Sequence, residues 1–164
     1  MNKTAIITGA SGGIGEAIAL ELDKKGYNLI INYNTNKDAA QKLCSSLKSA
    51  VPFKADVKNI NEAQVLADKA FSLFGGIDLL VNNAGVALTA LFQDFSEEDY
   101  NTVFGTNVLG TFNLSKAVIP YMLKNKSGSI INISSIWGMC GASCEVLYSS
   151  SKAAIIGFTK ALAK

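Results

Sequence analysis

Histidine and arginine are both absent from this sequence, whose 15 basic residues are all lysine. Without histidine, the chain can build neither a Ser-His-Asp or Cys-His nucleophile pair nor a metal site with imidazole ligands. Without arginine, it lacks the planar fork that binds guanine edges and phosphates in bidentate fashion. The formal net charge of +2 is also too small to indicate a basic patch. We therefore expect no metal ion and no nucleic-acid partner.

Cysteine and long apolar runs are scarce too. Cys44, Cys140 and Cys144 have no paired spacing, so they predict reduced thiols rather than disulfides or a four-sulfur zinc site. A redox role for Cys140 or Cys144 is a lesser alternative. No apolar run approaches the roughly 20 residues that cross a bilayer, and the chain opens directly on a strand without an apolar leader. We expect a cytoplasmic protein that does not enter membranes.

Short apolar runs alternate with longer segments of helical periodicity along the 164 residues, of which 49% are apolar and two are proline. The short runs predict buried parallel strands at 4–8, 28–33, 51–54, 79–82 and 129–134. The longer segments predict helices at 14–25, 36–48, 61–74 and 96–125, the last as a short helix followed by a long one, and a final helix from residue 148. Strict alternation predicts an α/β fold with a doubly wound parallel sheet, in one domain spanning residues 1–164.

A glycine-rich segment, Gly9-Ala10-Ser11-Gly12-Gly13-Ile14-Gly15, lies between the first predicted strand and the first predicted helix. In that position, glycines let the backbone turn tightly and approach a pyrophosphate, while amides at the helix start donate hydrogen bonds to it. A glycine turn that only packs the helix against the strand is the structural alternative. The segment predicts a dinucleotide site formed by Gly9, Ser11, Gly12, Gly13, Ile14 and Gly15.

Tyr148 and Lys152 stand four residues apart in a predicted helix, and Ser135 lies thirteen positions before Tyr148. Positions i and i+4 share one face of a helix, so the Lys152 ammonium can lie beside the Tyr148 phenol. A phenol ionises with a pKa of about 10, and a nearby positive charge favours the ionised form, which helps proton exchange near neutral pH. The set predicts a carbonyl-reducing site, although each residue alone has an ordinary structural explanation.

Together these motifs resemble the short-chain dehydrogenase/reductase family over the entire chain. The Thr-Gly-x3-Gly-x-Gly segment is followed by Asn82-Asn83-Ala84-Gly85 after the fourth predicted strand, by Asn107, and by Ser135, Tyr148 and Lys152. The resemblance implies a Rossmann-like NAD(P)-binding domain and an NAD(P)-dependent oxidoreductase. It also implies a catalytic tetrad formed by Asn107, Ser135, Tyr148 and Lys152.

The family pattern assigns a role to each member of that tetrad. Ser135 would donate a hydrogen bond to the substrate carbonyl, and Tyr148 would protonate its oxygen as hydride arrives. Lys152 would bind the ribose hydroxyls and favour ionisation of Tyr148, while Asn107 would anchor a water that feeds protons to Lys152. The resemblance also implies further cofactor contacts: Asp56 and Val57 near the adenine, Asn83, Ala84 and Gly85 beside the nicotinamide ribose, and Tyr148 and Lys152.

The choice between NADP(H) and NAD(H) depends on the stretch after the second predicted strand. NAD-binding proteins carry an acidic residue there for the ribose 2′-hydroxyl, whereas this chain has Asn34, Thr35, Asn36 and Lys37. Asp38 follows, but it falls within the predicted helix. Amide, hydroxyl and ammonium groups suit a 2′-phosphate, so NADP(H) is favoured. The glycine segment, which carries no basic residue, counts against this choice.

Within the family, the nearest likeness is to the 3-oxoacyl-[acyl-carrier-protein] reductases, which reduce a β-keto thioester with NADPH in fatty-acid synthesis. A carrier-bound or small-molecule ketone is therefore the expected substrate. The segment from Ser135 to Val146 also resembles reductases of an aminopentanone group on elongation factor P, so a protein-bound ketone stays open. Trp137, Met139 and Glu145 could line the substrate pocket. A nucleotide-binding remnant without turnover is the alternative from another class.

The chain ends at Lys164, inside a predicted helix with no C-cap glycine or following proline. Relatives in the family continue through a sixth strand, a substrate loop and a seventh strand, so a C-terminal third is expected to be missing and the active site to be incomplete. The helix through 107–121 and the helix from 148 match those that relatives use to dimerise, which predicts a homo-oligomer. We expect the 164-residue polypeptide alone to associate through an uncovered strand edge and to have little reductase activity.

Overall fold

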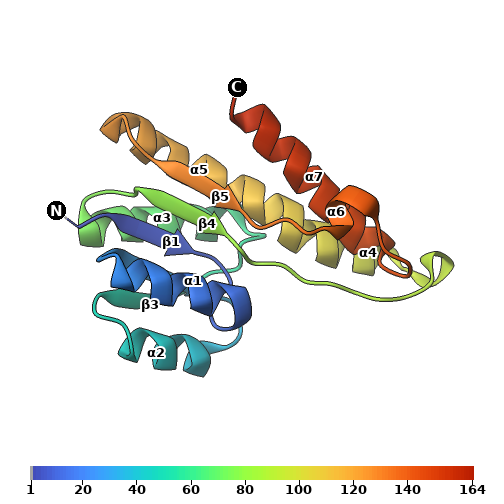
Figure 1. Ribbon diagram of the computed structural model, residues 1–164, viewed down its shortest axis with the longest axis horizontal. Helices are drawn as coiled ribbons and strands as arrows, with labels where there is room; N and C mark the ends of the chain where they lie inside the picture. Colours follow the sequence, from blue (N-terminus) through green and yellow to red (C-terminus); the bar gives the residue numbers. More distant parts are fainter. Residues whose placement is uncertain (1) are drawn as a thin grey trace.

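In the computed structural model, which describes residues 2–164, five parallel strands form one sheet with helices on both faces (Figure 1). The strands are β1 (Thr4–Ile7), β2 (Asn28–Tyr33), β3 (Ala50–Lys54), β4 (Leu79–Asn82) and β5 (Ser129–Asn132). Their order in the sheet is β3-β2-β1-β4-β5, so the chain moves outwards from β1 in both directions. The doubly wound Rossmann-like α/β fold is confirmed, with strand ends shifted by one or two residues.

Helical segments connect the strands and follow the last one: α1 (Gly13–Lys24), α2 (Lys37–Ser45), α3 (Ile60–Phe74), η1 (Phe92–Asp94), α4 (Glu97–Phe104), η2 (Gly105–Leu109), α5 (Gly110–Asn125), α6 (Trp137–Cys140) and α7 (Val146–Leu162). The expected short and long helices over 96–125 are continuous, because the π-helical turn η2 joins α4 to α5. Such turns are rare and often occur at functional sites. The sequence periodicity predicted neither η2 nor α6.

Local signals in the sequence set several helix boundaries. The Ser96 side chain accepts a hydrogen bond from the Asp99 N–H, and the Asp99 carboxylate accepts one from the Ser96 N–H, which forms a capping box at the start of α4. Gly26 adopts φ +78° just after α1, in the left-handed region that glycine tolerates best. Asp38 lies in the first turn of α2, as expected.

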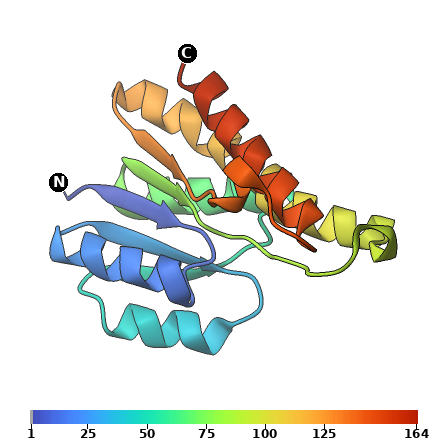
Figure 2. The same cartoon turned by 45° about the vertical axis from the view of Figure 1, so that its right-hand side comes forward.

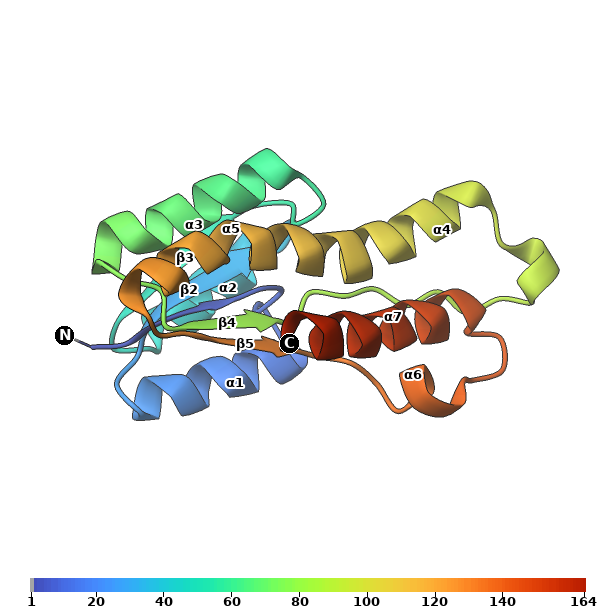
Figure 3. The ribbon, with the colours of Figure 1, turned by 90° about the horizontal axis from the view of Figure 1, so that it is seen from above.

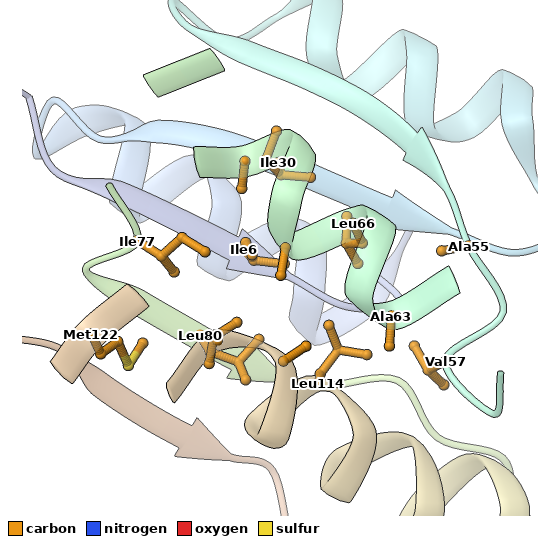
Figure 4. Close-up of a cluster of buried hydrophobic side chains, with 14 residues drawn as sticks. Ile6, Ile30, Ala55, Val57, Ala63, Leu66, Ile77, Leu80, Leu114 and Met122 are labelled. Atoms are coloured by element: carbon orange, nitrogen blue, oxygen red, sulfur yellow. The ribbon is translucent and has the colours of Figure 1, made fainter. Parts of the chain in front are cut away.

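Apolar side chains fill both faces of the sheet. On one face, Ile6, Ile30 and Leu80 from three adjacent strands pack against α3 and α5 (Figure 4). On the other face, Ile7 and Ile31 from two of the same strands pack with residues of α1 and α2. Successive residues of a strand point to opposite faces, so a strand buried on both sides must be apolar throughout. The two layers hold the carboxyl ends of the strands in fixed positions.

Several helical segments lie beyond the carboxyl ends of the strands. Figure 3 shows α4, α6 and the start of α7 beyond the ends of the strands, and Figure 2 shows α7 running beside β5. The chain leaves β1 towards one face of the sheet and β4 towards the other, and ligands of open α/β sheets bind where such connections diverge. Within residues 2–164, no helix combines the length and apolar character needed to cross a bilayer.

The close packing of α5 against the loop after β3 can be tested by substituting a glycine in α5 and, for comparison, a glycine in α7. A Cβ atom on Gly110 would lie 2.5 Å from Val57 Cγ2, whereas a Cβ atom on Gly157 in α7 would meet no atom of the described chain within 4 Å. We expect Gly110→Ala to lower the free energy of unfolding by about 1–3 kcal/mol through overpacking. Gly157→Ala should raise it by about 0.5–1 kcal/mol through better helix propensity. Urea unfolding measures the free energy of unfolding of both variants. Equal changes in the two variants would contradict the close contact between Gly110 and Val57.

Candidate active site

A cleft of about 600 Å³ runs along the carboxyl ends of β1, β2, β3 and β4. It brings together most of the residues that the sequence predicted for the cofactor: Gly9, Ser11, Gly12, Ile14, Asn34, Thr35, Asp56, Val57, Asn83, Ala84 and Gly85. Its walls also contain Tyr33, Lys58, Thr102 and Thr106, which the sequence did not single out. Loops that follow four different strands therefore meet around one elongated space.

Five predicted cofactor residues do not line this cleft: Tyr148 and Lys152 lie in a smaller cleft described below, and Gly13, Gly15 and Lys37 line neither. Gly13 begins α1 with φ +57°, so its backbone conformation alone explains the glycine. Gly15 packs underneath, where a Cβ atom would lie 2.7 Å from Asn83 Nδ2. Lys37 is exposed at the start of α2. The lysine that lines the cleft is Lys58, which follows Asp56 by two residues and could have been found from that position.

Two glycines of the turn after β1 differ in the space around them. Gly9 has φ +59°, and a Cβ atom there would lie 2.8 Å from Ala84 Cα, so packing explains this glycine. Gly12 differs, because its φ of 174° suits any residue and a Cβ atom would meet nothing within 4 Å. It lies on the cleft wall directly before α1, whose first N–H groups have no partners within the helix. Room and donors together fit a dinucleotide pyrophosphate.

The Asn83 side chain joins the turn after β1 to the turn after β4. Its Nδ2 donates to Thr8 O at 2.9 Å and to Gly9 O at 3.0 Å. In return, the Thr8 hydroxyl accepts hydrogen bonds from the N–H groups of Asn83 and Ala84, at 3.0 and 2.9 Å. The two cofactor motifs recognised in the sequence therefore form a single hydrogen-bonded unit.

Asn32 ties the end of β2 to the same unit. Its Nδ2 donates to Ala55 O at 3.0 Å, and its Oδ1 accepts a hydrogen bond from the Gly9 N–H at 3.4 Å. Only 1% of Asn32 is exposed, so these partners replace water. The residue sets where Tyr33 and Asn34 enter the cleft. Sequence reasoning missed it, although a polar residue inside an apolar strand is a usable signal.

A smaller cleft of about 210 Å³ adjoins the first and contains Tyr148 and Lys152. The two clefts share part of their walls, formed by Ile14, Asn83, Gly85 and Val86. Lys152 Nζ lies 5.6 Å from the centroid of the Tyr148 ring, one turn apart on α7. The structure thus places the predicted pair together, next to the space lined by the glycine turn.

The Lys152 ammonium is buried without a counter-ion. Lys152 is 4% exposed and forms no ion pair with any residue from 2 to 164. Its Nζ donates one hydrogen bond, to Ile133 O at 2.8 Å, and an ammonium carries three N–H donors. Burial lowers the pKa of Lys152 below its ordinary value of 10.5. Two donors of a destabilised cation are therefore available to a ligand in the cleft.

Asn107 lies in η2 with its side chain in the interior, 1% exposed. Its Oδ1 accepts from the Val86 N–H at 2.8 Å, and its Nδ2 donates to Val86 O at 3.0 Å and to Ser151 Oγ at 2.9 Å. Both amide hydrogens are thus engaged, which leaves the side chain one lone pair on Oδ1 for a water. A Cβ atom on Gly85 would lie 3.2 Å from Asn107 Oδ1 and 3.4 Å from Lys152 Nζ, so the glycine permits their approach.

Ser135 follows β5 and lines neither cleft. Its hydroxyl accepts a hydrogen bond from the Trp137 N–H at 3.2 Å, which leaves the hydroxyl hydrogen free to donate. The neighbouring Ser134 does line the smaller cleft and donates to Lys152 O at 2.8 Å. Trp137 and Met139 are exposed and line neither cleft. The contact of Ser135 with a substrate stays a prediction.

The three cysteines lie in different surroundings. Burial raises the pKa of Cys44 to about 11, which leaves little reactive thiolate at neutral pH. Cys140 is exposed. Cys144 has φ +60°, and its carbonyl oxygen accepts a hydrogen bond from the Ala90 N–H at 2.9 Å. This bond ties the loop after β4 to the loop before α7, so the clearest function of the Cys144 backbone is structural.

The fold and the glycine turn are those of a dinucleotide-binding α/β protein, and the half-buried Tyr148 lies beside the buried Lys152 next to the glycine-lined cleft. The sequence matches the short chain dehydrogenase family over residues 3–164, and the chain therefore belongs to this family. It is thus a member of a family of NAD(P)-dependent oxidoreductases that act on carbonyl and hydroxyl groups.

Individual relatives agree with this assignment. The chain is 39% identical to 3-oxoacyl-[acyl-carrier-protein] reductase FabG of Staphylococcus epidermidis and 43% identical to the uncharacterized oxidoreductase YmfI of Bacillus subtilis. Each comparison covers 100% of this chain and 69% of the relative. The crystal structure of a short-chain dehydrogenase from Streptomyces avermitilis has a TM-score of 0.94 at 31% identity, over 99% of this chain and 60% of that chain.

Burial of the Lys152 ammonium predicts how the stability of the protein depends on pH. Folding lowers the pKa of Lys152, so the unfolded chain binds more protons between the folded pKa and 10.5, and stability rises with pH across that window. Below the folded pKa the cost of burial is fully present. We expect Lys152→Met to raise Tm at neutral pH and to reduce the gain in stability as pH approaches 10.5, as measured by calorimetry. Lys160→Met, which removes an exposed charge on the same helix, is the control. A lower Tm for Lys152→Met than for this control would refute the cost of burial.

Proposed function

We propose that the protein is an NADPH-dependent carbonyl reductase that converts a 3-oxoacyl thioester or a similar ketone to the alcohol. The observation that carries the proposal is the buried Lys152 ammonium beside Tyr148, in a cleft that adjoins the glycine-lined cleft. The similarity to a 3-oxoacyl-[acyl-carrier-protein] reductase supports the substrate class. A carrier-bound ketone is therefore the first substrate to test.

Tyr148 and Lys152 of the smaller cleft would share the chemistry with Ser135, which lies outside that cleft at the end of β5. The carbonyl carbon would accept a hydride, which is the chemistry that a nicotinamide cofactor would supply when bound. Tyr148 donates its phenolic proton to the carbonyl oxygen, so one hydride and one proton together yield the alcohol. The two free donors of Lys152 bind the ribose hydroxyls, and its charge favours the phenolate that remains. Ser135 donates its free hydroxyl hydrogen to the carbonyl oxygen.

Asn107 supports this chemistry mainly by fixing the wall between the two clefts. Its amide binds both backbone groups of Val86, which lines the large and the small cleft alike. A water that carries protons to Lys152 would be held by the remaining lone pair of Oδ1, because both amide hydrogens are engaged.

The preference for NADPH is inferred from the cleft wall after β2. Asn34 and Thr35 line the cleft there, while Asp38 lies within α2 and does not. Lys58, after β3, also lines this cleft, and its Nζ lies 3.8 Å from Asp56 Oδ2. Amide, hydroxyl and ammonium donors suit a 2′-phosphate, whereas a free 2′-hydroxyl favours a carboxylate.

Assembly as a homo-oligomer is also inferred. An apolar groove of about 510 Å³ lies between η2, α5 and α7, lined in part by Phe104, Val108, Leu109, Phe112 and Phe158. Leu109 and Phe112 are nearly half exposed, and apolar side chains gathered on one face mark contact surfaces. A second copy of the chain would cover this groove. A cytoplasmic location stays a prediction.

The reductase proposal is tested by Tyr148→Phe, prepared in the full natural polypeptide. The variant should lower kcat for NADPH-dependent reduction of a β-keto thioester by roughly 10²- to 10⁴-fold, because the general acid is lost. Fluorescence titration should show an almost unchanged Kd for NADPH, since the phenol ring stays in place. Tyr100→Phe, which alters an exposed tyrosine of α4, should keep full activity. Near-normal turnover of Tyr148→Phe would remove this residue from its proposed role.

The cofactor preference is tested by Asn34→Asp. The wild-type protein should bind NADPH more tightly than NADH, and the new carboxylate should shift the ratio of the two Kd values towards NADH by at least about tenfold. A carboxylate repels the 2′-phosphate and accepts a hydrogen bond from a 2′-hydroxyl. Asn61→Asp places the same charge at the exposed start of α3 and should leave the ratio unchanged. Tighter NADH binding by the wild type would overturn the inference.

A further inference from the structure

We propose that Ser151 is a positioning residue that couples Asn107 to the turn of α7 that carries Tyr148 and Lys152. The inference rests on the proposed function, because it assigns a second residue layer to that same site. Ser151 is 0% exposed and lines neither cleft, so it contacts neither a substrate nor a cofactor placed there. Its influence must pass through its hydrogen-bond partners.

The Ser151 hydroxyl joins two parts of the chain that are far apart in sequence. Its Oγ accepts a hydrogen bond from Asn107 Nδ2 at 2.9 Å and donates one to Tyr148 O at 2.7 Å. On its other side, the Asn107 amide binds the N–H and the carbonyl oxygen of Val86. A continuous hydrogen-bonded path therefore runs from the loop after β4, through η2, to α7.

This path determines which way the Asn107 amide faces. The single hydrogen of the Ser151 hydroxyl points to Tyr148 O, so its lone pairs are left for a donor. Asn107 must then present Nδ2 to Ser151, which leaves Oδ1 for the Val86 N–H. The Val86 N–H and carbonyl oxygen select the same orientation, so removing the hydroxyl would leave a buried amide N–H unpaired and would break the link between Asn107 and α7.

Val86 connects this hydrogen-bonded path to the walls of the two clefts. Val86 lines both clefts, so its position sets the wall between the glycine-lined space and the space beside Tyr148. Ser151 fixes that wall relative to the very turn of α7 that carries the proton donor. A shift of this wall would misplace reacting groups without removing any of them, and small misplacements of this kind slow catalysis strongly.

An ordinary structural role is the alternative. A hydroxyl that donates to a backbone carbonyl earlier in its own helix is common, and Thr159 does so to Ile155 O in the same helix. The hydrogen bond accepted from Asn107 distinguishes Ser151. Ser149 provides a matched comparison, since it is also buried on α7 and accepts a hydrogen bond from the Ala142 N–H, but its hydroxyl forms no hydrogen bond with Asn107.

The test uses Ser151→Ala in the full natural polypeptide with NADPH and a β-keto thioester. We expect kcat to fall by about 10- to 100-fold, the pH at which kcat is half-maximal to move, and the Kd for NADPH to stay close to wild type. Ser151→Cys, which keeps a weak donor and acceptor in nearly the same volume, should recover part of kcat. Ser149→Ala should leave kcat and the pH profile unchanged. If Ser151→Ala behaves like Ser149→Ala, the proposal is wrong.

A double-mutant cycle separates coupling from general destabilisation. Because Ser151 is proposed to act through Asn107, adding Ser151→Ala to Asn107→Ala should lower kcat little further. Additive losses would overturn the proposal, and Ser151→Cys serves in the same cycle if the alanine variant does not fold. Loss of activity in Ser151→Ala with normal activity in Tyr148→Phe would instead refute the proposed function, so the two failures are distinguishable.

Discussion

The Asn83 amide holds together the two turns on which the candidate site depends. It donates to the carbonyl oxygens of Thr8 and Gly9 at once, and this approach is possible only because Gly15 beneath it has no Cβ atom. Thr8 completes the contact by accepting two N–H groups from the turn after β4. The two turns follow adjacent strands, and these bonds extend the connection between them beyond the last backbone bond, from Thr8 N–H to Val81 O. With them, the two turns form one rigid wall, which a cofactor pyrophosphate and ribose require.

Lys152 is a lysine without a counter-ion inside the described part of the protein. Lys152 loses hydration on folding and gains only one hydrogen bond within the described chain, to Ile133 O. A buried cation of this kind is unfavourable for folding, and residues of this kind are concentrated at functional sites. The apolar layers on both faces of the sheet offset the cost. A ligand that accepts hydrogen bonds from the two remaining donors would reduce it further.

The sequence predicts best what is determined locally. The strand and helix periods depend on neighbouring residues, and they were predicted; the capping box at Ser96 and the left-handed glycine at position 26 are equally local features. The surroundings of Asn107 were not, because they depend on a π turn and on contacts 21 and 44 residues away, to Val86 and Ser151. The choice between Lys37 and Lys58 as the lysine of the cleft also needs the fold, since it depends on how β3 ends against the start of α2.

Because the two clefts share a wall, a ligand in one cleft would affect the surroundings of a ligand in the other. Ile14, Asn83, Gly85 and Val86 face both spaces, so a dinucleotide in the large cleft and a ketone in the small one would contact the same residues. Two asparagines, the half-buried Asn83 and the buried Asn107, fix this wall through bonds to backbone groups. An aspartate could not replace either of them, because it lacks the N–H donors that both contacts use. The reacting groups would then be positioned mainly by the protein backbone, and a bound cofactor would form part of the surface that the substrate meets.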